Sequence, residues 1–378
     1  MSIAVSIGPP TRDAGAAFAD LAERAPANAF VDPTALKAAE AVCFSKPEMM
    51  LAWEDGQSER KLVGAWAMRR KSLLPGVVIL LAPAFNYAFA GTPVLDPAMA
   101  ESTMLAFLDA IAQSATLPKV LRLEDMDAES PACISLMRMV EKNGWPFHRI
   151  STSQRPIATK TDGIKRSGST RKKLRQDWSR LSAVGDLAMI HEREPARVTH
   201  AFEEFLALEA SSWKGKRGTA LRSKPRDVAF ARRLIGDFAV AGKASVALLR
   251  LGERTIAAQV LLHSGRVAFT WKTAFDSEFA KYSPGMLLVD RISDELLSSG
   301  EVDKLDSCSP EKSFMAQLWT GRQTMTDLLV EVRPHRSLSF RLALMSEMLR
   351  QRLRQYRSKV RGFSLPHLSK PRTPVEAT

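Results

Sequence analysis

The chain passes from a strand pattern into a helix pattern at Tyr282-Ser283-Pro284-Gly285-Met286-Leu287-Leu288. Proline's fixed φ suits a first helical turn, so a helix is expected to begin near Pro284. Gly285 would let the backbone approach a ligand closely. The amides of Gly285, Met286 and Leu287 would then point outward at the positive end of the helix dipole. This junction is either a seat for a phosphate or pyrophosphate, or an ordinary strand-to-helix turn.

The elements around this junction recur in the same order in the two halves of the chain. The first half is expected to hold a hairpin, two strands, a helix and a further strand, over residues 48–69, 77–81, 86–89, 97–114 and 120–124. The second half repeats this order with a hairpin, a strand, a helix and a strand, over residues 244–263, 267–273, 286–298 and 302–306. Two copies of one α/β unit explain the repeat. Each copy should form a mixed, mainly antiparallel sheet flanked by helices.

Length and composition are consistent with two domains, because 378 residues with 45% hydrophobic content can bury large cores. We expect a first lobe over 1–155, a second lobe over 156–340, a basic amphipathic helix over 341–363 and a disordered tail over 364–378. No charged segment followed by a long apolar stretch opens the sequence, and the most apolar segment, 77–90, is too short to cross a bilayer. A cytoplasmic location is therefore expected.

The cysteine pattern argues against a disulfide or a metal site. Cys43, Cys133 and Cys308 are odd in number and widely separated, which suits free thiols in a reducing compartment. Their spacing matches no zinc motif, and the six histidines are scattered along the chain. The sequence therefore predicts no metal.

The net charge of +13 is concentrated in two segments. Residues 155–180 hold nine lysines and arginines against two aspartates, and residues 341–361 hold seven against one glutamate. Such segments can attract nucleic acid, anionic lipid, acidic polymer or a polyphosphate cofactor, or they can be solvated helix faces. In the second segment, apolar residues recur at three- and four-residue steps: Leu342, Met345, Leu349, Leu353, Tyr356 and Val360. This apolar face is expected to pack, on the body of the protein or peripherally on an anionic membrane surface.

A set of residues in the second half follows a recognisable order. The set comprises Ser169 to Arg175, Glu209, Ser212-Trp213-Lys214, Gly218, the Tyr282 to Leu288 junction, Asp306, Lys312 and Trp319. With these residues the chain resembles the GNAT superfamily, in particular the tandem GNAT acetyltransferases associated with bacterial cellulose and exopolysaccharide biosynthesis, which are related to Fem-type peptidyltransferases. The resemblance covers most of the chain. It implies two tandem GNAT-like lobes, of which the first is degenerate and the second binds the thioester.

The activity implied by this resemblance is transfer of an acyl group from acetyl-CoA, or another acyl-CoA, to an amine or hydroxyl. A sugar or an envelope-polysaccharide precursor is the acceptor suggested by the family. Direct transfer needs a group that takes the acceptor's proton, amides that polarise the carbonyl, and an acid for the leaving thiolate. Asp306 is the candidate base, Glu209 accompanies it in the catalytic set, and Tyr282 is the candidate acid. Ordinary roles for these three are a cap, a solvated side chain and packing.

Binding residues follow from the same motifs. For the CoA portion, the candidates are Ser283, Gly285, Met286 and Leu287, to which Lys312 adds a cation. For the acceptor, the candidates are Trp213, Lys214 and Trp319. If Pro310 starts a helix, Lys312 and Trp319 share one face. A surface lysine, a charged loop and core tryptophans are the ordinary alternatives.

Two other functions fit the sequence. The same fold could use aminoacyl-tRNA as donor, as Fem-type peptidyltransferases do, and the basic segment 155–180 would then contact RNA phosphates. The absence of sustained heptads for an inserted coiled-coil arm argues against this donor. A non-catalytic scaffold is the third hypothesis, with the basic helices binding a partner.

Overall fold

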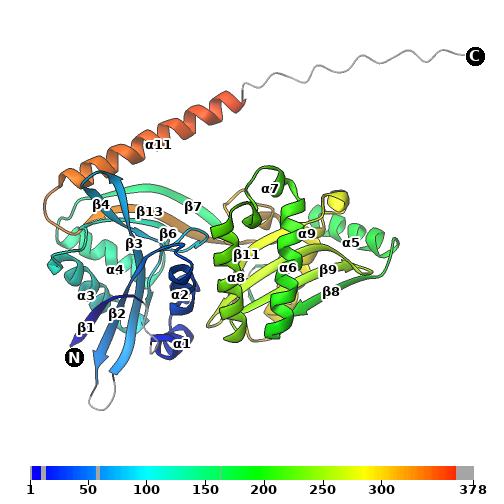
Figure 1. Cartoon of the computed structure of the whole chain (residues 1–378), viewed down its shortest axis with the longest axis horizontal. Coiled ribbons are helices and arrows are strands. Elements are labelled where there is room, and N and C mark those ends of the chain that lie inside the picture. The colour runs from blue at the N-terminus through cyan, green and yellow to red at the C-terminus, as the bar shows by residue number, and fades with distance from the viewer. Residues whose placement is uncertain (1, 10–13, 57–59, 162, 363–378) are drawn as a thin grey trace, which may run out of the picture.

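The fold is described from a computed structural model that places residues 2–9, 14–56, 60–161 and 163–362, with the backbone alone over 354–362. Two lobes lie side by side, and one long helix projects from the first of them (Figure 1). The disordered tail expected over 364–378 falls outside the described residues.

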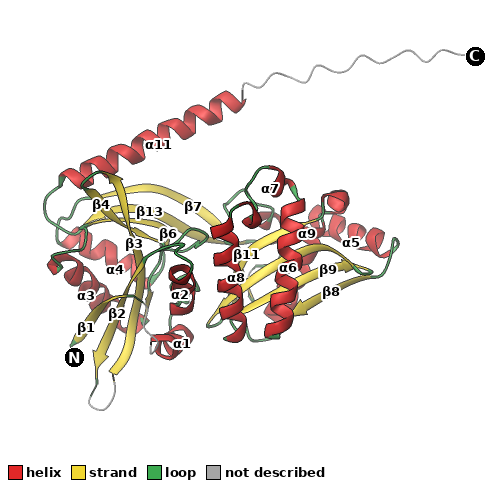
Figure 2. Cartoon of the chain, in the orientation of Figure 1, coloured by secondary structure: helices red, strands yellow, loops and turns green. Residues whose placement is uncertain are grey.

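Both lobes are built from strands covered by helices (Figure 2). The first lobe contains β1 (Ile3–Gly8), α1 (Ala14–Arg24), α2 (Pro33–Ala41), β2 (Pro47–Asp55), β3 (Arg60–Leu74), β4 (Val77–Ala82), β5 (Val94–Leu95), η1 (Pro97–Met99), α3 (Ala100–Gln113), β6 (Val120–Asp127), α4 (Pro131–Lys142) and β7 (Phe147–Thr159). The second contains α5 (Ser169–Ser182), β8 (Leu187–Glu192), α6 (Pro195–Ser211), α7 (Trp213–Lys216), η2 (Leu221–Ser223), α8 (Pro225–Val240), β9 (Ala244–Leu251), β10 (Arg254–Ser264), β11 (Val267–Phe275), η3 (Ser277–Tyr282), α9 (Pro284–Ser298), β12 (Lys304–Asp306) and α10 (Met315–Leu318). The chain ends with β13 (Gly321–Glu331) and α11 (Leu338–Gly362).

The predicted repeat is confirmed by the pairing of the strands. In each lobe an antiparallel hairpin, β2–β3 or β9–β10, leads to a third antiparallel strand. That third strand then pairs in parallel with the strand that follows the next long helix, as β4 with β6 and β11 with β12. Each lobe is thus a mixed, mainly antiparallel sheet flanked by helices, as predicted.

The two sheets join edge to edge because each lobe contributes a strand to the other. Strand β7 pairs with β12 of the second lobe, and β13 pairs with β6 of the first. The order β4-β6-β13-β7-β12-β11 places β13, from the end of the chain, beside β6 of the first lobe. In turn, β7 pairs with β13 over most of its length and with β12 of the second lobe at its end. A single 13-stranded sheet results. The boundary expected at residue 156 therefore falls inside β7.

The strand expected over 86–89 is wrong, because these residues form a turn and an irregular segment. Pro83 cannot donate to a strand ladder, and Tyr87 has a positive φ of 69°. The segment crosses to the second lobe instead, where the carbonyl of Tyr87 accepts a hydrogen bond from the Trp271 indole (2.9 Å).

Aromatic packing between the lobes makes their interface part of one hydrophobic core. Phe30 meets Phe269 edge to face, with ring centroids 5.5 Å apart. Phe230 of the second lobe stacks on Phe44 at 4.4 Å and packs against Phe85 at 5.2 Å. Since such a core excludes water, the lobes are expected to hold a fixed orientation.

The long helix α11 is observed, but the face expected to pack does not do so. Met345, Leu349 and Leu353 are 64%, 59% and 49% exposed. The helix instead buries Phe340 and Ala343. The opposite side of the helix packs instead, against Ile79, Val120 and Leu329 of the sheet. The side chains of Tyr356 and Val360 lie outside the described residues. None of the described helices combines the length and apolar composition that a membrane span requires.

We predict that weakening β13 destabilises both lobes together. Leu328 lies in β13, is fully buried and packs in the core of the first lobe. Leu328→Ala should lower the free energy of unfolding by about 2–5 kcal/mol. Hydrogen exchange should speed up in β6 and β12 alike, because β13 and β7 link them. Val240→Ala, at a position 79% exposed, is the control. Faster exchange in β6 alone would contradict the coupling.

Candidate functional site

The second lobe contains a pocket of about 510 Å³ beside the start of α9. Residues from β11, α7, the α9 N-terminus and the loop after β12 line it, and one residue of the first lobe, Phe89, completes its wall. The lining consists of Phe89, Ser212, Trp213, Lys214, Thr270 to Phe275, Ala280, Ser283 to Met286, Ser309 and Phe314. Open space therefore lies beside the start of α9.

The junction itself forms a tight turn into α9. Ser283 adopts a left-handed conformation (φ 52°, ψ 49°), and Pro284 occupies the first helical turn, as predicted. The carbonyl of Ser283 accepts hydrogen bonds from the amides of Met286 (2.9 Å) and Leu287 (3.1 Å). The expectation that these two amides point outward is therefore wrong. Within the described part of the chain, only the amide of Gly285 in this group has no acceptor.

A cation from another element adds to the positive end of α9. Lys173 of α5 places its Nζ 3.1 Å from the Ser283 Oγ and also pairs with Asp177. The neighbouring Arg171 pairs with Asp290 of α9, which fixes α5 against this helix. The basic segment singled out in the sequence thus supplies charge at the junction. In contrast, Lys312 is exposed in a turn and lies outside the set of residues that lines the pocket.

Two lysines line the pocket in different states. Lys214 donates to the Glu209 carboxylate (3.1 Å) and to the carbonyl of Thr273 (3.0 Å). The ammonium of Lys272 lies over the ring of Tyr87 at 4.4 Å and forms no hydrogen bond or ion pair with another described residue. Burial lowers the pKa of Lys272 to about 8. A lysine in this state can lose its proton near neutral pH.

Sequence reasoning missed Lys272, although a signal was present. This residue is the one charged side chain in the otherwise apolar or neutral strand Val267–Phe275. A lysine costs free energy when it faces a protein interior, so such a position points to a pocket or a partner. Its partner ring, Tyr87, comes from the other lobe and is not visible in a local pattern.

Glu209 is held by structural contacts. Its side chain is buried, with 1% exposed. One carboxylate oxygen binds Lys214, and the other accepts a hydrogen bond from the backbone amide of Leu221 at 2.8 Å. It supports Lys214 from behind and does not line the pocket. The solvated position considered for Glu209 is therefore wrong.

The two tryptophans and the tyrosine predicted for the site lie in three different environments. Trp213 is half exposed, lines the pocket and carries Arg217 over its ring at 5.1 Å. Trp319 is buried, with its indole donating to Ser293 at 3.2 Å, so it belongs to the core. Pro310 starts no long helix, since α10 covers only Met315–Leu318. Tyr282 is half buried below Lys281 and lies outside the pocket lining.

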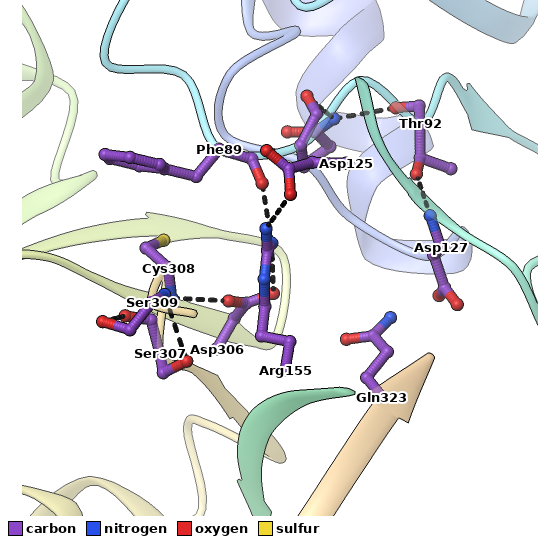
Figure 3. A network of polar contacts seen from close by, with 12 residues as sticks. Phe89, Thr92, Asp125, Asp127, Arg155, Asp306, Ser307, Cys308, Ser309 and Gln323 are labelled. Atoms are coloured by element: carbon purple, nitrogen blue, oxygen red, sulfur yellow. Dashed lines mark hydrogen bonds and ion pairs between the residues drawn. The ribbon is translucent and has the colours of Figure 1, made fainter. Parts of the chain in front are cut away.

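Asp306 ends β12, as expected, and its carboxylate belongs to a buried polar network between the lobes (Figure 3). One oxygen accepts from the amide of Cys308 at 2.8 Å, and the other lies 3.6 Å from the Arg155 guanidinium. Arg155 also donates to Asp125 (2.7 Å) and to the carbonyl of Phe89 (2.6 Å). These are the contacts of a structural ion pair, and the base role of Asp306 stays a prediction.

Within the described residues, no group of three or more histidine, cysteine or acidic side chains could hold a metal ion. Cys43, Cys133 and Cys308 are free thiols, as predicted. The pocket itself is lined by two lysines, the N-terminus of α9 and aromatic side chains.

Comparison with known proteins points to the same region. Residues 168–314 match the family model described as an acetyltransferase (GNAT) domain. None of the curated proteins compared with the chain matches it. The chain therefore carries a GNAT-type acetyltransferase domain, and the segment matched holds the whole pocket apart from Phe89.

Several solved structures share the fold of the whole chain. L-PGS from Bacillus licheniformis is 13% identical with a TM-score of 0.55, and the match covers 89% of this chain and 96% of that one. FemX is 10% identical with a TM-score of 0.55, covering 87% and 98%. The C-terminal domain of a candidate lysylphosphatidylglycerol synthetase from Agrobacterium fabrum is 14% identical with a TM-score of 0.53, covering 88% and 95%. At these identities the likeness shows that the two-lobed fold of the chain is shared with these proteins.

We predict that Arg155→Met destabilises the protein by about 3–5 kcal/mol, because it leaves the buried carboxylate of Asp306 and the partly exposed one of Asp125 without their cation. Burial already raises the pKa of Asp125 to about 6 in the native protein, and the loss of Arg155 should raise it further. The folded variant then binds more protons than the unfolded chain, so its stability should recover as pH falls through 6. Urea denaturation across this range measures both effects.

The double variant Arg155→Met/Asp306→Asn is the matched control. It removes the charge that Arg155→Met leaves unpaired on Asp306, so it should regain part of the lost stability. A double variant no more stable than Arg155→Met would show that the ion pair is not the origin of the effect.

Proposed function

We propose that this chain, whose residues 168–314 form a GNAT-type acetyltransferase domain, transfers an acyl group from an acyl-CoA, acetyl-CoA in the simplest case, to an amine or hydroxyl. The observation that carries the proposal is the pocket beside the α9 N-terminus, which combines a free amide, two lysines and an apolar wall. A thioester with a polyphosphate tail needs this combination of a phosphate seat and a dry cleft.

The donor would bind with its diphosphate at the start of α9. The amide of Gly285 and the ammonium of Lys173 offer donors to phosphate oxygens there, and the helix dipole favours negative charge. Ser283 and Met286 border the same opening. The thioester would then enter between Trp271 and Phe314, where apolar side chains exclude water.

Lys272 is our candidate for moving the proton. The acceptor nitrogen or oxygen attacks the thioester carbonyl carbon, the carbon–sulfur bond breaks, and the proton of the acceptor passes to the thiolate. A neutral Lys272 can take that proton from the acceptor and, as an ammonium, return it to the sulfur. Asp306 and Glu209 are less suited to this step because both are already paired with cations.

The acceptor would approach past Trp213 and Lys214, at the mouth formed by α7. A half-exposed indole can stack on the apolar face of a sugar ring, and the ammonium can meet an anionic or hydroxyl group. A sugar or an envelope-polysaccharide precursor, as the resemblance to exopolysaccharide-associated acetyltransferases suggests, fits these side chains.

A second candidate donor is aminoacyl-tRNA. The fold likeness to FemX and L-PGS favours it, as do the exposed cations Lys172, Arg175 and Arg180 on α5. In this case the ester of the aminoacyl group would occupy the same pocket, and RNA phosphates would lie along α5.

Gly285→Pro should weaken acetyl-CoA binding about tenfold or more, because it removes the one free amide of the junction. Gly285→Ala is the control, since it keeps the amide and its added Cβ meets Phe275 and Thr273 at ordinary contact distances of 3.5 and 3.7 Å. Calorimetric titration with acetyl-CoA, and in parallel with bulk tRNA at several salt concentrations, measures both donors. Binding of tRNA alone would favour the second candidate, and binding of neither would favour a scaffold.

Lys272→Met should lower kcat/KM by about a hundredfold or more while leaving donor binding in place. In the native enzyme, activity should rise as pH increases through about 8, because the neutral amine is the active form. This inflection should disappear in the variant. Lys281→Met, which removes an exposed lysine nearby, is the control. A variant that keeps the inflection near pH 8 would exclude Lys272 as the proton acceptor.

A further inference from the structure

An exposed surface on the first lobe has no part in acyl transfer. We call it the α11 surface, and it consists of the outward side of α11 and the adjoining β3–β4 hairpin. Its apolar side chains are Leu74, Leu338, Met345, Met348, Leu349 and Leu353, each between 45% and 69% exposed. Its cations are Lys71, Arg341 and Arg352.

The exposed apolar residues share one side of α11. Leu338, Met345 and Leu349 are separated by seven and four residues, which places them along one side of a helix. The opposite side holds Phe340 and Ala343, which are buried against the first lobe. Helix α11 is therefore apolar on two sides, and within the described residues only one of them is covered.

A groove of about 540 Å³ runs between α11 and the β3–β4 hairpin. Leu74, Met345 and Leu349 line it, together with the cations Lys71 and Arg352. Apolar and cationic side chains thus alternate around one opening. A ligand that satisfies it must offer both apolar chains and negative charge.

The charges on this surface are poorly neutralised. Arg350 pairs with Glu347, but Lys71, Arg341 and Arg352 form no ion pair with another described residue. Burial, and then the nearby Arg350 and Arg122, lower the pKa of Lys71. A second copy of the same surface would bring these cations against each other, which disfavours self-association. A layer of anionic headgroups over acyl chains would neutralise the cations and cover the leucines and methionines together.

We propose that the α11 surface docks this protein on an anionic lipid bilayer. Helix α11 lies in the plane of the interface, with Met345 and Leu349 among the acyl chains and Arg341 and Arg352 at the headgroups. Figure 1 shows α11 starting at the outer edge of the first lobe and rising obliquely above it, so that its C-terminal part stands clear of both lobes. The inference is independent of the acyl-transfer chemistry, because the pocket lies in the second lobe.

Sedimentation of the full chain with vesicles tests the proposal. The protein should sediment with vesicles of phosphatidylcholine mixed with phosphatidylglycerol, and much less with vesicles of phosphatidylcholine alone. Arg341→Gln/Arg352→Gln should bind about thirtyfold more weakly, since each basic residue near such a surface contributes roughly one kcal/mol. Met345→Glu/Leu349→Glu should abolish binding. The control, Val240→Glu, changes an apolar residue of the second lobe that is even more exposed and should bind as the native protein does.

Thermal unfolding of each variant confirms that the fold is retained, because every substituted side chain is exposed. Equal binding to both kinds of vesicle would overturn the role of the cations. Failure to bind either kind, together with a doubled mass by light scattering that Met345→Glu/Leu349→Glu restores to one chain, would show that the surface holds a second copy. Failure to bind either kind with the mass of one chain would also overturn the proposal.

Discussion

The buried guanidinium of Arg155 is the contact on which the joined sheet depends. It lies on β7 and reaches Asp125 of β6 on one side and Asp306 of β12 on the other. A buried cation is tolerated only when it is fully paired, so these contacts fix the register of β7 between β13 and β12. A slip by one residue would turn Arg155 to the other face of the sheet and leave both carboxylates unpaired. The strand exchange therefore brings the three charged side chains together, and their ion pairs in turn fix the register of the exchanged strands.

The contacts of Arg155 also help to form the pocket. The third contact of Arg155 is the carbonyl of Phe89, in the irregular segment after β4. Anchored there, the ring of Phe89 forms part of the pocket wall, and the ring of Tyr87 lies against Lys272. The first lobe thus sets the environment of the lysine in the second. A lysine that faced water at this position would keep its ordinary pKa, so the pairing of lobes has a chemical consequence.

Local patterns in the sequence predicted most helices and strands correctly, but not the contacts of individual side chains. The hairpins, the start of α9 at Pro284 and the repeat of element order follow from periodicity and turn residues, which act over a few positions. The exchange of β7 and β13 pairs residues far apart in sequence, such as Gln323 with Arg155, and no local signal encodes it. For the same reason Asp306 was placed correctly at a strand end but without its ion pair. Lys272 was overlooked because its partner ring belongs to the other lobe. For α11, the helix and its period were predicted, but two apolar sides compete and sequence alone does not choose the one that packs.

The two basic segments differ in how their cations are paired. Helix α5 lies at the far end of the second lobe and α11 on the first (Figure 1). Charges on a protein surface are screened over about 8–10 Å at physiological salt, so the two segments act separately. On α5, Arg171 pairs with Asp290 of α9, and Lys173 pairs with Asp177 and reaches Ser283 at the α9 N-terminus. On α11, Arg341 and Arg352 form no ion pair with another described residue and stand among exposed leucines and methionines, which matches an extended, half-apolar anionic surface. The pairing of the cations, more than their number, distinguishes the two.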